Sequence, residues 1–302
     1  GLVTALSAAN IDAEAVILST RDQGIVNKLY PVITEFNYVI AKVNIGAESY
    51  LLDATDPLLP FGLLPIRCIN DQGRVINLKK ASYWIDLKAS QKSVTNYVLD
   101  GQLTKEGIIK GTITIHSLGY DAFNKRKEIK SHNSIEEYVE KLDNKLTNLK
   151  ITSEEVYNID SLELPLTEKY GVEFAAHDAT NSSQLYLNPF FINRISKNPF
   201  NLNERTYPVD LGSASDERIV INLSLPEKYD LIDHPKDMAI GLPNNGGKFI
   251  LKTTFEDNKI AISQYKQFSK SIYGPEEYLY LKEFYSKIIQ HQKTDLLLKK
   301  SN

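Results

Sequence analysis

The sequence predicts an α+β protein, made of an antiparallel sheet with a helix followed by a β-rich, sandwich-like region with two helices. Short runs that alternate apolar and polar residues recur along the chain, separated by Gly, Pro and Asn. Three stretches show helical periodicity instead: residues 2–9, 134–149 and 275–291. With 302 residues, 42% of them apolar, the chain can bury a substantial core. We expect two domains, 1–80 and 81–302, and leave a further division near 150–185 open.

The first domain is predicted to begin with a helix and a strand. Leu2, Ala5, Leu6 and Ala9 follow the i, i+3, i+4, i+7 spacing of one helix face, and Asn10 suits the end of the helix. No capping residue precedes this pattern, so we expect the helix to begin before Gly1. The run EAVILS at 14–19 has the β-branched character of a buried strand.

A hairpin is predicted next, with strands at 36–44 and 49–54 and a turn centred on Ile45 and Gly46. Counting outward from that turn places Tyr38 opposite Asp53. Cross-strand partners share a face of a sheet. We therefore expect a polar aromatic ring and a carboxylate side by side where the second strand ends. The simplest interpretation of the pair is that it stabilises the two strands.

The region from residue 57 to residue 131 is predicted to hold only loops and strands. Pro57, Pro60, Gly62 and Pro65 keep the segment after the hairpin irregular. Gly101, Gly107, Gly111 and Gly119 are interpreted as breaks between elements. The expected strands are residues 74–78, 93–99, 107–116 and 128–131.

The two helices of the second domain have clear start signals. Ser134 and Glu137 form a capping box, which is followed by an apolar stripe that we interpret as core packing: Tyr138, Leu142, Leu146 and Leu149. Pro275 suits the first position of a helix that runs to about His291. The remaining stretch from 151 to 268 is strand-like, with a hairpin of strands 248–255 and 259–268, and 296–298 is a last strand.

The composition excludes several classes of partner. The chain has 35 Lys and Arg against 38 Asp and Glu, a net charge of -3, so no overall field attracts nucleic acid or anionic lipid. The basic run at 125–127 is interpreted as a solvated turn rather than a phosphate site. No apolar run is long enough to span a bilayer, and the alanine-rich start lacks the basic leading segment of a signal peptide.

No motif for a cofactor or a metal is present, so we expect neither. The phosphate-binding loop, the Rossmann glycines, H-E-x-x-H and G-x-S-x-G are all missing. The histidines are widely spaced: His116, His132, His177, His234 and His291. His177 has an adjacent acid, Asp178, but hydrogen bonding in a polar turn explains the pair. The single cysteine, Cys68, would be a nucleophile only if a distant histidine folded onto it, and otherwise it is a small buried side chain.

The first eighty residues carry a resemblance to a known family. The segment 2–21, the strand FNYVIAKV and the stretch LLDATDPLLPFGLLP resemble the later half of a transglutaminase-like (papain-like) domain. More specifically, they are similar to such domains in large exported bacterial proteins, where they lie between β-rich domains of unknown function. The rest of the chain resembles the accompanying β-rich region more loosely. The resemblance implies a periplasmic or cell-envelope location.

The resemblance also implies roles for two residues. In this superfamily a Cys at a helix start is the nucleophile, a His on a following strand is the base, and an Asp on the next strand orients the His. Asp53, in the strand end Leu52–Thr55, matches the acid position, and Tyr38 falls at the histidine position. The helix at 2–9 resembles the body of the helix whose start carries the cysteine, so the nucleophile position would lie before Gly1.

A Tyr at the base position has a chemical consequence. An imidazole with a pKa of about 6.5 suits proton transfer near neutral pH, whereas a phenol with a pKa of about 10 does not. We expect this chain to be a noncatalytic pseudoenzyme with a β-rich binding or scaffolding domain, whose partner is a protein, peptide or glycan. The alternative is a fragment of a cysteine peptidase or transglutaminase whose nucleophile lies upstream of Gly1.

Overall fold

The computed structural model describes residues 1–77, 80–146, 149–175, 184–191, 193–226 and 229–300. The chain divides into two compact units, Gly1–Lys92 and Ser93–Asn302. The pair His177-Asp178 lies outside the described residues.

The first unit is a five-stranded antiparallel sheet with one short helix. The strand order is β3-β2-β1-β4-β5. Its buried core includes Val16, Leu18, Ile40 and Val75 from the central strands, and Cys68 lies among them. The elements are α1 (Leu2–Ala8), β1 (Ala13–Leu18), β2 (Tyr38–Ile45), β3 (Glu48–Leu52), β4 (Gln72–Ile76) and β5 (Tyr83–Asp86). The predicted helix and strands of this region are therefore confirmed, and β5 extends the sheet past residue 80 because it pairs with β4.

The register of the β2–β3 hairpin differs from the predicted one. Ile45 pairs with Glu48 and Ala41 with Leu52, so the turn is centred on Gly46 and Ala47. Gly46 has φ +62°, a conformation that glycine adopts at no steric cost and that suits a two-residue hairpin turn. The predicted placement of Tyr38 directly opposite Asp53 is thus wrong by two residues, and the ladder ends at Leu52.

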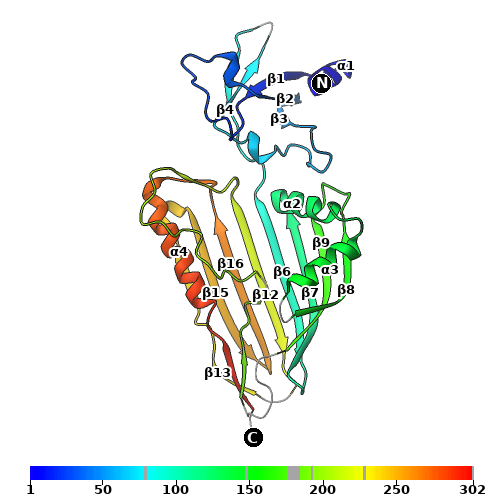
Figure 1. Cartoon of the computed structure of the whole chain (residues 1–302), viewed down its shortest axis with the longest axis vertical. Helices are drawn as coiled ribbons and strands as arrows, with labels where there is room; N and C mark the ends of the chain where they lie inside the picture. Colours follow the sequence, from blue (N-terminus) through cyan, green and yellow to red (C-terminus); the bar gives the residue numbers. More distant parts are fainter. Residues whose placement is uncertain (78–79, 147–148, 176–183, 192, 227–228, 301–302) are drawn as a thin grey trace. The chain divides into compact units, whose positions relative to one another are not determined.

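The second unit is built on one eight-stranded sheet that curls into a half-barrel (Figure 1). Its order is β14-β15-β16-β12-β6-β7-β9-β8. Neighbours are antiparallel except β12 and β6, which are parallel. The strands are β6 (Ser93–Leu103), β7 (Ile108–Leu118), β8 (Leu149–Tyr157), β9 (Leu166–Ala175), β12 (Ser215–Ser224), β14 (Met238–Gly241), β15 (Gly247–Glu256) and β16 (Lys259–Phe268).

One face of this sheet is buried and carries the helices. Alternate residues of β15 and β9 are buried, while many of those between them stay accessible to solvent, as in antiparallel sheets with one face toward water. We call the buried side the covered face. Figure 1 shows α2 and α3 beside β6–β9 and α4 beside β15 and β16. The helices are α2 (Gly119–Lys130), α3 (Ile135–Lys145) and α4 (Tyr278–His291), the last preceded by a 3-10 turn at Pro275–Glu277.

Two small sheets complete the second unit. One has the order β10-β18-β13 and the other pairs β11 with β17. Their strands are β10 (Gln184–Leu187), β11 (Val209–Asp210), β13 (Tyr229–Asp233), β17 (Ile272–Tyr273) and β18 (Leu296–Lys300). The predicted sandwich is therefore replaced by one large curled sheet with small additions, since all the long strands of this unit join the same eight-stranded sheet.

Helix α2 is the main element that the sequence patterns missed. Residues 128–131, predicted as a strand, are its last turn and end, and the basic run at 125–127 is helical rather than a solvated turn. Arg126 is fully buried and donates hydrogen bonds to the carbonyl oxygens of Asn158, Ser161 and Leu164. An arginine in the buried face hides the apolar periodicity by which amphipathic helices are detected.

The other helices and the late hairpin match the predictions. Ser134 caps α3 by accepting a hydrogen bond from the Glu137 backbone N–H at 3.1 Å. Helix α3 stops at Lys145, so Leu149 belongs to β8 rather than to the helical stripe. The hairpin of β15 and β16 turns at Asp257 and Asn258, whose φ values of +48° and +60° are those of a tight hairpin turn.

Candidate functional site

Tyr38 and Asp53 lie in contact in the first unit. The Tyr38 hydroxyl donates a hydrogen bond to Asp53 Oδ2 at 2.8 Å. Tyr38 begins β2, and Asp53 directly follows β3. The long phenol ring spans the diagonal between strands, which explains why the two groups meet although they are not directly paired. The structure therefore brings the two predicted site residues together.

Two further side chains complete a closed hydrogen-bonded cluster. Thr55 donates its backbone N–H (2.7 Å) and its hydroxyl (2.5 Å) to Asp53 Oδ1. Arg67 donates to the Tyr38 hydroxyl at 2.9 Å, and its guanidinium carbon lies 4.9 Å from the ring centre. Each hydroxyl has one hydrogen, and both hydrogens go to Asp53. The phenol is therefore a donor to the acid and not a free proton acceptor.

Cys68 lies in the core beside this cluster and is shielded from solvent. It ends the 3-10 turn Ile66–Cys68, and its exposed fraction is 0%. Burial, reinforced by the charge of Asp53, raises the pKa of the Cys68 thiol to about 11. Residues 1–92 contain no histidine. A thiol without a base and without access to solvent is not an activated nucleophile.

A cavity of about 400 Å³ borders Asp53. Its walls come from α1, β2 and the segment after β3 and include Leu2, Val39, Asp53 and Thr55. Cys68 is not among the described residues that line it. The acid therefore faces an open space that the thiol of this chain does not reach.

Removing the Tyr38 hydroxyl should destabilise the first unit. Tyr38→Phe leaves Asp53 Oδ2 and the Arg67 guanidinium without one partner each, which we expect to cost about 1 kcal/mol of unfolding free energy. Tyr50→Phe is a matched control on the neighbouring strand, because the Tyr50 hydroxyl makes no hydrogen bond to the described residues; it should change stability by less than about 0.5 kcal/mol. Urea unfolding of both variants measures the difference, and equal effects would show that the cluster contributes nothing.

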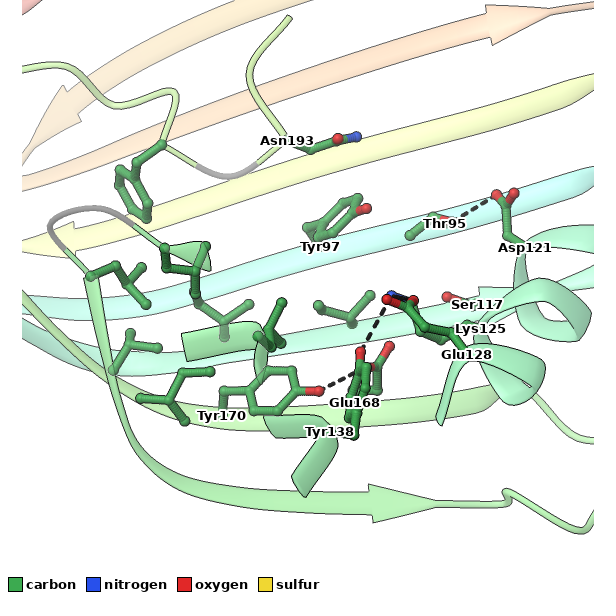
Figure 2. Close-up of a pocket in the computed structure, with 18 of the residues that line it drawn as sticks. Thr95, Tyr97, Ser117, Asp121, Lys125, Glu128, Tyr138, Glu168, Tyr170 and Asn193 are labelled. Carbon is green, nitrogen blue, oxygen red and sulfur yellow. Dashed lines mark hydrogen bonds and ion pairs between the residues drawn. The ribbon is translucent and has the colours of Figure 1, made fainter. Parts of the chain in front are cut away.

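A second cavity, of about 450 Å³, lies in the second unit between the covered face and helices α2 and α3. Its floor is a row across three strands: Tyr97 pairs with Ile115, and Ile115 pairs with Glu168. Figure 2 shows polar side chains gathered at one end of it. They include Thr95, Ser117, Asp121, Lys125, Glu128, Tyr138 and Glu168.

The polar end of this second cavity is crowded with ionisable groups. The hydroxyls of Tyr138 and Tyr170 donate to Glu168 Oε1 at 2.9 and 2.6 Å. Burial and the Glu168 charge raise the pKa of Tyr138 to about 12. Burial also raises the pKa of Asp121, whose carboxylate accepts a hydrogen bond from the Thr95 hydroxyl at 2.7 Å. Strongly perturbed groups in a concave site are typical of binding sites.

The sequence patterns did not single out this second cavity. Glu168 was visible only as one polar residue between apolar ones in a strand, and its neighbours come from four separate segments. The alternation of β9, in which Leu166, Tyr170 and Val172 share a face with Glu168, was the available signal, because it placed a carboxylate on an otherwise apolar face.

Neither a metal centre nor a membrane-spanning helix is found in the described part of the chain. Within the described ranges, His, Cys, Asp and Glu form no group of three that could hold a metal ion. No helix in that same part of the chain combines the length and apolarity required to cross a bilayer.

Two comparisons with known proteins found a similarity, one over part of the second unit and one over nearly the whole chain. Residues 183–298 match the model of a family described as a domain of unknown function with a solved structure, DUF3858. The crystal structure of a "putative protease" from Parabacteroides distasonis is similar at 14% identity and a TM-score of 0.45. That similarity covers 97% of this chain and 41% of the other, so the chain spans less than half of that protein. No curated protein matches the sequence.

Proposed function

We propose that this chain is a noncatalytic, transglutaminase-like module whose β-rich second unit binds a protein, peptide or glycan partner at the bacterial cell envelope. The observation that carries the proposal is the state of the Tyr38 hydroxyl, whose hydrogen is held by Asp53 at 2.8 Å while Arg67 donates to its oxygen. A hydroxyl whose hydrogen is held by a carboxylate and whose oxygen already accepts from a guanidinium is not placed to take a proton from a thiol, which is the task of the base in acyl transfer.

The buried thiol supports the same conclusion. Cysteine-dependent acyl transfer needs a thiolate that the substrate can reach. Cys68 has neither property, because it is fully buried and its pKa is raised to about 11. Asp53 then has a structural role, as the acceptor that holds Tyr38 and Thr55 at the end of the hairpin. The cell-envelope location rests on the resemblance of residues 2–80 alone.

Turnover assays test the proposal. The purified chain should neither hydrolyse a casein substrate nor incorporate a fluorescent cadaverine into it above the level of a Cys68→Ala variant. Asp53→Asn should leave both signals at that level and lower only the stability of the first unit. Turnover that disappears in Asp53→Asn, with the variant still folded by circular dichroism, would refute the noncatalytic role.

The same assays on the complete gene product separate the proposal from the alternative. If a longer product carries an active cysteine, it should turn over substrate in a manner that depends on Asp53, because the acid position would then be in use. Activity of the longer product would favour a peptidase or transglutaminase that works despite having Tyr38 at the position of the base. Its absence would support the binding module.

A further inference from the structure

Glu168 has a buried oxygen without a partner. The residue is 1% exposed, and both tyrosine hydroxyls go to Oε1. Oε2 accepts no hydrogen bond from any described residue. Leaving a buried carboxylate oxygen unpaired is costly, and native proteins seldom keep such an atom without a use. Glu168 lines the second cavity, and Figure 2 shows it close to Tyr138 and Tyr170, whose hydroxyls donate hydrogen bonds to it.

The charges around the cavity leave a negative balance. Lys125, the one lysine among the described residues that line the cavity, is paired with Glu128 at 2.7 Å and also donates to the Tyr138 hydroxyl at 3.3 Å. Asp121 and Glu168 make no ion pair within 4 Å in the described part of the chain, although the charge of Lys266 acts on Asp121, and Glu168 and Lys125 act on each other. The polar end therefore has three carboxylates and one ammonium, a composition that attracts a cation.

The remainder of the cavity is apolar. Side chains from β7, α3, β8 and β9 line it, among them Ile113, Leu142, Leu149 and Val172. Its volume of about 450 Å³ lies in the range that holds small organic ligands. The hydroxyl of Tyr97, on the floor, makes no hydrogen bond to the described residues and is a further polar contact for a ligand.

We propose that the second cavity binds an organic cation: a ligand with an apolar body and an ammonium group that the carboxylates at the polar end, Glu168 among them, attract. The apolar body lies against the sheet and α3, and the ammonium group faces Glu168 and Asp121. Two sources offer this chemistry, a free amine and the lysine side chain of a peptide.

This inference rests on the proposal that the second unit binds a ligand, and it is independent of the catalytic state of the first unit. Turnover in the assays above would refute the noncatalytic role and leave the amine site intact. Failure of the amine site would leave that role untouched.

Calorimetric titration of the whole chain with matched probes tests the site. Hexylamine, hexanol and hexanoate share one apolar body and differ in the head group. Hexylamine should bind at least about 10-fold more tightly than hexanol, because its ammonium group adds one charge-assisted hydrogen bond. Hexanoate, which carries a negative charge, should not bind. Nα-acetyl-lysine N-methylamide identifies the source: binding comparable to that of hexylamine assigns the site to a lysine side chain, and much weaker binding assigns it to a free amine.

Three variants locate the binding. Glu168→Gln should weaken hexylamine binding at least about 10-fold and change hexanol binding little. Glu173→Gln is the matched control, because Glu173 lies on the same strand but pairs with Lys110 outside the cavity; it should leave affinity within about 2-fold. Ile115→Trp places an indole beside Glu168 and should abolish binding.

Three results would overturn the proposed amine site. Hexanol or hexanoate binding as well as hexylamine would show that Glu168 does not select a cation. Unchanged hexylamine affinity in Glu168→Gln or in Ile115→Trp would place the binding elsewhere. No detectable hexylamine binding to the natural chain would also overturn it. If Glu168→Gln does not fold, the Trp variant and the three head groups still decide.

Discussion

Arg126→Met should lower the unfolding free energy of the second unit by about 3 kcal/mol or more. The guanidinium is 0% exposed and donates to three carbonyl oxygens of the 158–164 loop, at 2.8 to 3.0 Å from one of its nitrogens. Methionine keeps much of the apolar stem but leaves those carbonyls unpaired, and each hydrogen bond to a charged donor contributes about 1.5–3 kcal/mol. Thermal unfolding followed by circular dichroism measures the loss as a fall of several degrees in Tm.

The same substitution should also alter the shape of the second cavity and so lower its affinity for hexylamine. Arg126 ties α2, which forms a wall of the cavity, to the loop that leads into β9 and Glu168. Lys141→Met is the control: Lys141 is exposed on α3 and, among the described residues, makes only an i,i+4 pair with Glu137, so its loss should cost less than about 0.5 kcal/mol. Equal stability of the two variants would show that the loop is held by other contacts.

Local patterns were sufficient for much of the fold. The capping box at Ser134 and Glu137 fixed the start of α3, and the turn residues Asp257 and Asn258 fixed the hairpin of β15 and β16. These signals involve residues close together in the sequence, so they can be recognised without knowledge of distant contacts. The strands of the first unit were predicted for the same reason.

Elements that depend on distant contacts were not predictable. Arg126 can lie in the buried face of α2 because carbonyl oxygens more than thirty residues away accept its hydrogen bonds. The sequence around Arg126 contains no pattern that predicts these partners. Gly101 and Gly111, interpreted as breaks, face each other within β6 and β7. A Cβ on Gly111 would lie 2.5 Å from the Asp100 carbonyl oxygen, so close strand packing explains this glycine, not a turn.

The candidate sites show the same division. The contact between Tyr38 and Asp53 could be predicted from two strands and one turn. The predicted register was wrong by two residues, but the two groups still meet because the Tyr38 side chain is long. The row Tyr97–Ile115–Glu168 required the order of three strands, two of them separated by α2, α3 and β8. Their catalytic or binding roles stay predictions that the experiments above address.

The second large effect concerns Cys68. Burial and the Asp53 charge raise the pKa of its thiol from 9.0 to about 11, so the folded chain keeps the proton that an unfolded chain loses. Alkylation by iodoacetamide at pH 8 should be at least about 100-fold slower than in urea, since only the thiolate reacts. The stabilising contribution of the protonated thiol is complete below pH 9 and is lost as the pH rises through 11.

The most direct test of the proposed noncatalytic role is intact-mass spectrometry after exposure to a thiol-directed acyl probe at pH 7.5. The folded chain should keep its unmodified mass, and an adduct should form at Cys68 only after denaturation. A rapid adduct on the folded chain that is lost in Asp53→Asn would contradict this role, because it would show an activated thiol that depends on the acid.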